Sequence, residues 1–139
     1  MKKEFVPYEL SLKLKVLGFD EPCFGYYDGN LNLQFMYNGI PEKFTEKRMG
    51  PADSVWVGWI SAPTYSQTFR WFREKYDLIS SIYQHGVSVK TGLSSFEYMI
   101  DKLNNLGLSQ FIEDFPYNTY EEAELGCLKK LIEIIEKQK

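Results

Sequence analysis

The chain has 139 residues, of which 44% are hydrophobic, 17% aromatic and 25% charged. Its 16 basic and 19 acidic side chains give a net charge of −3, which argues against a basic nucleic-acid-binding protein and a polybasic membrane binder. No apolar run approaches the roughly 18 residues that cross a bilayer, and no secretory h-region follows the two N-terminal lysines. We expect one cytoplasmic globular domain over residues 1–139.

Residues 8–17 fit two patterns. Their apolar residues alternate with polar ones, as in a strand, yet three of the leucines also lie on one helical stripe. Pro7 suits the first position of a helix, and Gly18 suits the position just after its end. Because Leu and Lys favour helices whereas strands prefer β-branched residues, we predict a helix.

Residues 22–37 are predicted to form a hairpin around Asp28-Gly29, a dipeptide that favours a two-residue type I′ turn. This turn would pair Tyr26 with Leu31. Alternation from that register predicts one apolar face and one wet face, as in an antiparallel sheet. The apolar face would comprise Phe24, Tyr26, Leu31, Leu33 and Phe35.

The segments 38–54 and 55–60 differ strongly in polarity. Residues 38–54 contain two glycines, two prolines and several charges, which predicts a long and mobile surface loop. Residues 55–60 are Val-Trp-Val-Gly-Trp-Ile, apolar on both faces, which predicts a central strand buried on both sides.

A helix is predicted over residues 63–76, with Pro63 at its first position and Ser61 as a nearby cap. Its aromatic stripe is expected to face the sheet. The stripe consists of Tyr65, Phe69, Phe72 and Tyr76. Four residues fall off this stripe and form a candidate partner-binding surface: Arg70, Trp71, Arg73 and Lys75.

Three interpretations of these four residues are open. Trp and Arg dominate the hot spots of protein interfaces, which favours a protein partner. Aromatic and guanidinium groups also stack on bases and hold phosphates, which would indicate a nucleotide or nucleic acid. In the third interpretation, Trp71 packs under the 38–54 loop and the arginines pair with acidic neighbours.

Residues 79–91 are predicted to form a second hairpin with a three-residue loop, Gln84-His85-Gly86. Residues 94–107 are predicted to form a helix that starts at Ser94 or Ser95 and ends near Gly107. Together the predicted elements give an α+β fold. A single antiparallel sheet of about five strands carries helices on one face, with a long C-terminal helix across it.

The C-terminal helix begins with a capping box, Thr119-Tyr120-Glu121-Glu122. Its apolar face, which runs to Ile135, is wider than one sheet contact needs. Leu125 and Ile132, seven residues apart, form one edge of this surplus. That edge either packs against the 8–17 helix of the same chain or docks a homodimer or another protein.

Three stretches resemble a family of short uncharacterised proteins from gut Bacteroides-type bacteria and their phages and prophages. They are FVPYE (5–9) with LGFDEPCFGYY (17–27), APTYSQ (62–67) with FRWFREKY (69–76), and YEEAEL (120–125) with CLKKLIEI (127–134). The resemblance implies a phage or mobile-element origin and a small stand-alone domain. It implies no activity.

The sequence offers few groups for catalysis. His85, the single histidine, is expected at an exposed hairpin tip with no orienting partner. Cys23 and Cys127 are interpreted as buried, reduced thiols. Asp20, Glu21 and Asp28 fit a helix end and a turn better than a catalytic pair.

We therefore expect no metal and no cofactor. The preferred function is that of a small non-catalytic accessory protein of a phage or mobile element that binds another protein or a second copy of itself. The first alternative is a nucleotide or nucleic-acid binding module that uses the Arg/Trp helix face, although nucleic acid is disfavoured. The second is an enzyme of unidentified type. A membrane partner is not expected.

Overall fold

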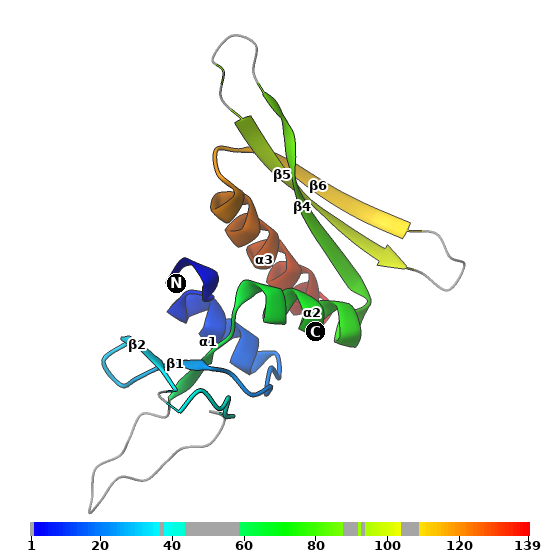
Figure 1. Ribbon diagram of the computed structural model, residues 1–139. Helices are drawn as coiled ribbons and strands as arrows, with labels where there is room; N and C mark the ends of the chain where they lie inside the picture. Colours follow the sequence, from blue (N-terminus) through cyan, green and yellow to red (C-terminus); the bar gives the residue numbers. More distant parts are fainter. Residues whose placement is uncertain (1, 37, 44–58, 88–91, 93, 104–108) are drawn as a thin grey trace, which may run out of the picture. The chain divides into compact units, whose positions relative to one another are not determined.

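The computed structural model describes residues 2–36, 38–43, 59–87, 92, 94–103 and 109–139 (Figure 1). The chain divides into two compact units, unit 1 (Met1–Tyr65) and unit 2 (Ser66–Lys139), and each is described by itself. The α+β class is confirmed. The single sheet of about five strands is wrong, because the described strands form two separate antiparallel sheets, one in each unit. That residues 1–139 act as one domain stays a prediction.

Unit 1 combines short helices with a small sheet in the order β2-β1-β3. Its elements are η1 (Lys2–Glu4), α1 (Tyr8–Val16), β1 (Gly25–Tyr27), β2 (Leu33–Phe35) and β3 (Ile60–Ala62). Helix α1 packs beside β3. Phe5, Tyr27, Ile60 and Ala62 form a buried cluster, against which Tyr8 and Leu33 pack.

The helix predicted over 8–17 is confirmed as α1. Pro7 precedes the helix as its N-cap instead of occupying its first position. Gly18 takes a positive φ of 99° and donates its N–H to the Lys15 carbonyl at 3.0 Å. The Phe19 N–H then donates to the Leu14 carbonyl at 2.9 Å. The side chains of Leu14 and Phe19 are buried. This pair of hydrogen bonds is a Schellman motif, and it ends the helix.

The hairpin predicted within 22–37 is present, but its two-residue turn is wrong. The observed register pairs Tyr27 with Leu33, so the loop covers residues 28–32. The Asp28 carboxylate accepts hydrogen bonds from the N–H groups of Asn30 (2.9 Å) and Asn32 (3.0 Å). Leu31, and not Gly29, has the positive φ, at 63°. The Asp28 side chain therefore organises a wider loop.

The longer loop also changes which residues of β1 face the core. Tyr27 is buried at 8% exposure, whereas Phe24 is 52% exposed and Tyr26 is half-buried. The predicted apolar face is therefore wrong for this strand. The observed register differs from the predicted one by three residues, an odd number, so Tyr27 and not Tyr26 shares a face with Leu33.

Val6 links separate parts of unit 1. Its carbonyl accepts hydrogen bonds from the Tyr27 hydroxyl (2.7 Å) and the Ser11 hydroxyl (3.1 Å). Its N–H donates to the Pro63 carbonyl at 2.9 Å, next to an isolated β-bridge between Phe5 and Thr64. One residue thereby joins α1, β1 and the residue that follows β3, through the two peptide groups on either side of it.

The mobile-loop prediction for 38–54 and the strand prediction for 55–60 fall mainly on residues 44–58, outside the described residues. Before this gap, Cys23 and Glu42 form an isolated antiparallel bridge. After it, all residues of β3 are buried, as predicted for the strand end at Ile60. In the described sheet, however, the central strand is β1, which lies between β2 and β3.

Unit 2 packs one long helix on a larger sheet in the order β4-β5-β6 (Figure 1). Its elements are α2 (Tyr65–Tyr76), which begins at the boundary, β4 (Leu78–Val87), β5 (Ser94–Leu103), β6 (Ser109–Tyr117) and α3 (Tyr120–Lys137). Helix α3 contacts all three strands. Helix α2 starts at Tyr65, later than predicted, because Ser61 belongs to β3.

The second hairpin and the helix over 94–107 are wrong. Strand β4 continues through Gln84, His85 and Gly86 with only a break in register, and it pairs with β5. Residues 94–103 form β5, paired on both sides. The apolar residues of this segment fit both a helical and an alternating period, and pairing with two neighbours selects the strand. No sequence pattern above predicts β6.

The C-terminal helix is confirmed. The Thr119 hydroxyl accepts a hydrogen bond from the Glu122 N–H at 3.1 Å, as the capping box predicts. The Glu122 carboxylate accepts from the Asn118 N–H at 3.2 Å instead of from Thr119. The buried face consists of Ala123, Cys127, Leu128, Leu131, Ile132 and Ile135.

Replacing Phe72 tests the packing of α2. The Phe72 side chain is fully buried, whereas Phe69 is half-buried. Phe72→Ala should lower the free energy of unfolding by about 3–5 kcal/mol, and Phe69→Ala should cost clearly less. Urea melts of both variants measure this difference. A smaller loss for Phe72→Ala than for Phe69→Ala would contradict the described orientation of α2.

Candidate functional site

The predicted Arg/Trp surface of α2 is only partly exposed. Arg70, Arg73 and Lys75 are exposed, but Trp71 is buried at 5% exposure. The prediction that Trp71 lies off the buried face is wrong. The buried side of α2 is rotated relative to the predicted aromatic stripe. It consists of Tyr65, Thr68, Trp71 and Phe72.

Trp71 contacts several of its neighbours on α2. Its ring makes edge-on contacts with Phe72 (5.0 Å between centroids) and Tyr76 (5.4 Å). The Lys75 ammonium lies 4.9 Å from the centroid of the Trp71 ring, which is within the range of a cation–π interaction. Lys75 and Trp71 therefore contact each other. Arg70 and Arg73, three residues apart, share an exposed face.

The Leu125–Ile132 edge of α3 is not an exposed surface. Ile132 is 1% exposed and Leu125 is half-buried. Ile132 is buried because α3 packs against three strands of its own unit and needs a wide apolar face. The role of Leu125 and Ile132 in partner binding stays a prediction.

The two faces of the unit 2 sheet differ. Ser80 and Tyr98 face α3, because Ser80 is hydrogen-bonded to Cys127 and Tyr98 lines a pocket with α3 residues. Their neighbours along β4 and β5 point to the opposite side, since alternate residues of a strand face opposite ways. We call that side the open face. It includes Ile79, Ser81, Tyr83, Met99 and Asp101.

At the edge strand β4, the open face presents two apolar side chains to solvent. Ile79 is 37% exposed and Tyr83 is 36% exposed. Opposite them on β5 lie the half-buried Asp101 and the buried Glu97. Sequence reasoning missed this surface because it assigned β5 to a helix. The alternation from Phe96 to Asp101 was the signal that could have found it.

On the other face, α3 and the strands β5 and β6 line an open pocket of about 420 Å³, which we call the α3 pocket. The sheet contributes Tyr98, Ile112 and Tyr117. The helix contributes a charged rim and one glycine. These residues are Gly126, Lys129, Lys130 and Glu133.

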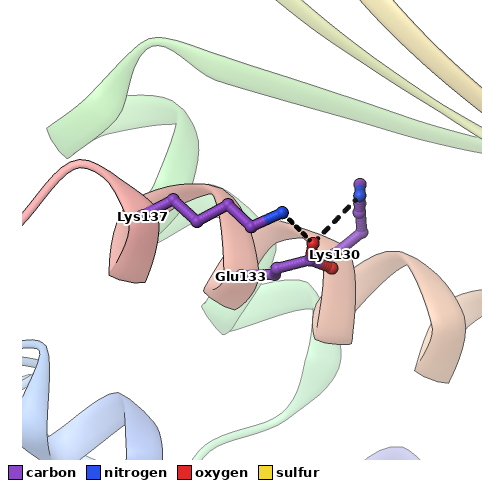
Figure 2. A network of polar contacts seen from close by, with 3 residues as sticks. All are labelled: Lys130, Glu133 and Lys137. Carbon is purple, nitrogen blue, oxygen red and sulfur yellow. Dashed lines mark hydrogen bonds and ion pairs between the residues drawn. The ribbon is translucent and has the colours of Figure 1, made fainter.

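The charges of the rim are ordered by a hydrogen-bond network (Figure 2). Glu133 Oε1 accepts from Lys137 Nζ at 2.6 Å and from Lys130 Nζ at 3.3 Å. These hydrogen bonds lower the pKa of Glu133, and the one from Lys137 has the largest effect. The Glu133 carboxylate therefore stays ionised at neutral pH.

Gly126 allows Tyr117 to approach the helix closely. A Cβ atom at position 126 would lie 2.5 Å from the Tyr117 hydroxyl oxygen, which is closer than side chains tolerate. The missing side chain therefore makes room for the phenol and shapes one wall of the α3 pocket.

The predicted catalytic candidates occupy structural positions. The Asp28 carboxylate organises the loop that follows it. Hydrogen bonds from backbone N–H groups lower the pKa of this carboxyl group, and the one from Asn32 has the largest effect. Asp20 makes an exposed ion pair with Lys43 at 3.9 Å. His85 lies within β4, so its predicted place at a hairpin tip is wrong. Across the described ranges, His, Cys, Asp and Glu form no cluster of three or more that could hold a metal ion.

No helix within the described part of the chain is both long and apolar enough to span a bilayer. Comparisons with protein families, with curated proteins and with solved structures found no match to this chain.

Both cysteines are buried and free of disulfides, as predicted. Burial raises the pKa of the Cys127 thiol to about 12. Since the thiolate is the reactive form, the folded chain should resist alkylation by iodoacetamide at pH 8, and denaturant should expose both thiols. Mass spectrometry of the labelled chain measures this, with Cys127→Ala as the control that isolates Cys23. Rapid labelling of Cys127 in the folded chain would contradict its burial.

The raised pKa also has a consequence for stability. The folded chain keeps the Cys127 proton to a higher pH than the unfolded chain, whose thiol has a pKa near 9.0. The stabilisation from this group is therefore fully present below pH 9.0 and is lost as the pH rises toward about 12. In Cys127→Ala, urea melts should show a weaker decline over this range.

Proposed function

We propose that this chain is a small non-catalytic accessory protein that acts by binding another protein through the open face of unit 2. The observation that carries the proposal is the exposure of Ile79 and Tyr83 on the sheet face opposite α3. Exposed apolar side chains gathered on one face favour a protein contact. The resemblance of three stretches to proteins of Bacteroides phages and prophages supports a phage or mobile-element setting.

The chemistry of the open face defines the kind of partner. Tyr83 offers a large and rigid contact surface, and Ile79 adds a second apolar anchor on the same strand. Asp101, paired with Ile79 across the strands, adds negative charge beside this anchor. The complementary partner surface therefore combines an apolar centre with Lys or Arg at its edge.

The carboxyl groups of Asp28 and Glu133 are not suited to proton transfer at neutral pH. A carboxyl group that exchanges protons at neutral pH needs a raised pKa. The pKa values of Asp28 and Glu133 are both lowered by hydrogen bonds to their charged forms. The burial of Trp71 likewise weakens the nucleotide alternative, because base stacking would require this ring to leave its packed position.

The double variant Ile79→Ala/Tyr83→Ala tests the proposal. Immobilised wild-type chain should capture a protein from cells that carry the element, and the double variant should capture at least about tenfold less, because two interface anchors are lost. Val16→Ala is the matched control, since Val16 is 76% exposed on unit 1 and does not belong to the open face. Equal capture by all three forms, with equal melting temperatures, would overturn the proposal.

The molar mass from light scattering tests whether the partner is a second copy of the chain. A chain that binds its own kind should have twice the monomer mass of 16.3 kDa at tens of micromolar. The double variant should return it to the monomer mass. A dimer that persists in the double variant would place the self-contact elsewhere and would contradict the role of the open face in self-association.

A further inference from the structure

We propose that the α3 pocket binds a small aromatic carboxylate. The pocket of about 420 Å³ lies within the range of roughly 300–1,000 Å³ that is typical of small-molecule sites. It lies on the sheet face opposite the open face, so the proposal is independent of the protein-binding function.

The floor and wall of the pocket favour a flat apolar group. The rings of Tyr98 and Tyr117 lie 5.9 Å apart between centroids and are inclined by 36°. Ile112, in β6, adds an aliphatic surface beside them. Because Tyr98 is buried, an aromatic ring placed here would lie on the half-buried Tyr117 and the exposed Ile112.

The rim favours a negative charge. Lys129 is exposed and makes no ion pair within the described residues, and Lys130 uses one of its three N–H donors on Glu133. The charge of Glu133 is held by Lys137 at the shorter distance, 2.6 Å against 3.3 Å for Lys130. The ammonium groups of Lys129 and Lys130 therefore remain able to bind a carboxylate, although the chain as a whole is acidic.

Gly126 connects the two halves of the site. Because it has no side chain, the Tyr117 hydroxyl lies against the helix one turn before Lys129 and Lys130. Tyr117, Lys129 and Lys130 line the same pocket, so a ligand whose ring lies on Tyr117 has both lysines at its edge.

Three probes of matched size and different charge test the proposal in NMR titrations of the full chain. 2-Naphthoate should give saturable shifts of the Gly126 and Lys129 amides with a Kd of about 1 mM or tighter. 2-Naphthamide keeps the ring without the charge, and inorganic phosphate supplies charge without the ring. Both should bind at least about tenfold more weakly.

Single-charge variants locate the contact. Lys129→Gln and Lys130→Gln should each weaken 2-naphthoate binding by roughly tenfold, because each removes one charge-assisted contact. Lys13→Gln, on α1 of unit 1, changes the net charge equally and should have no effect. Lys129 is exposed, so its replacement is expected to leave the fold intact.

Each of the remaining outcomes would overturn the proposal. Absence of saturable shifts would show that the pocket binds no aromatic acid. Equal affinity for 2-naphthamide would show an apolar cavity without anion selectivity. Equal affinity for phosphate, or equal weakening by Lys13→Gln, would show a general attraction of anions.

Discussion

The packing of α3 on the β4-β5-β6 sheet is the interaction on which unit 2 depends. A three-stranded sheet needs a covering layer to exclude water from one face, and α3 supplies it with six buried side chains. Burying one Leu or Ile side chain contributes roughly 1.5–3 kcal/mol, so the four fully buried Leu and Ile residues of α3 dominate this layer. The capping box at Thr119 fixes where the helix starts, and thereby which of its residues meet the sheet.

A single covering helix makes the two faces of the sheet chemically different. On the covered face, the close approach of Tyr117 to Gly126 leaves a hollow with a basic rim. On the other face, Ile79 and Tyr83 remain exposed beside acidic residues. One small unit thus offers a positively charged pocket suited to a small anion and an apolar, acidic surface suited to a protein.

The sequence predicted the elements whose ends are defined by local chemistry. Gly18 ends α1 and Thr119 starts α3 through contacts with residues no more than five positions away, so the pattern alone was sufficient. The hairpin at Asp28 and the strand β5 were wrong because cross-strand pairing decides between patterns that are locally equivalent. The candidate sites were likewise predicted only where local contacts define them. Trp71 and Ile132 were placed by helical period alone, and the α3 pocket requires a strand, β6, that no local pattern predicted.

The hydrogen bonds of Val6 also constrain when unit 1 can form during synthesis. The Val6 N–H reaches the Pro63 carbonyl, and Phe5 bridges to Thr64, so the two ends of the unit must meet. Until residue 64 has left the ribosome tunnel, β1 lacks its β3 neighbour and Val6 lacks its acceptor. A nascent chain of this unit therefore completes its fold only after nearly all of its length has emerged, because the partners of Val6 and β1 are among its last residues.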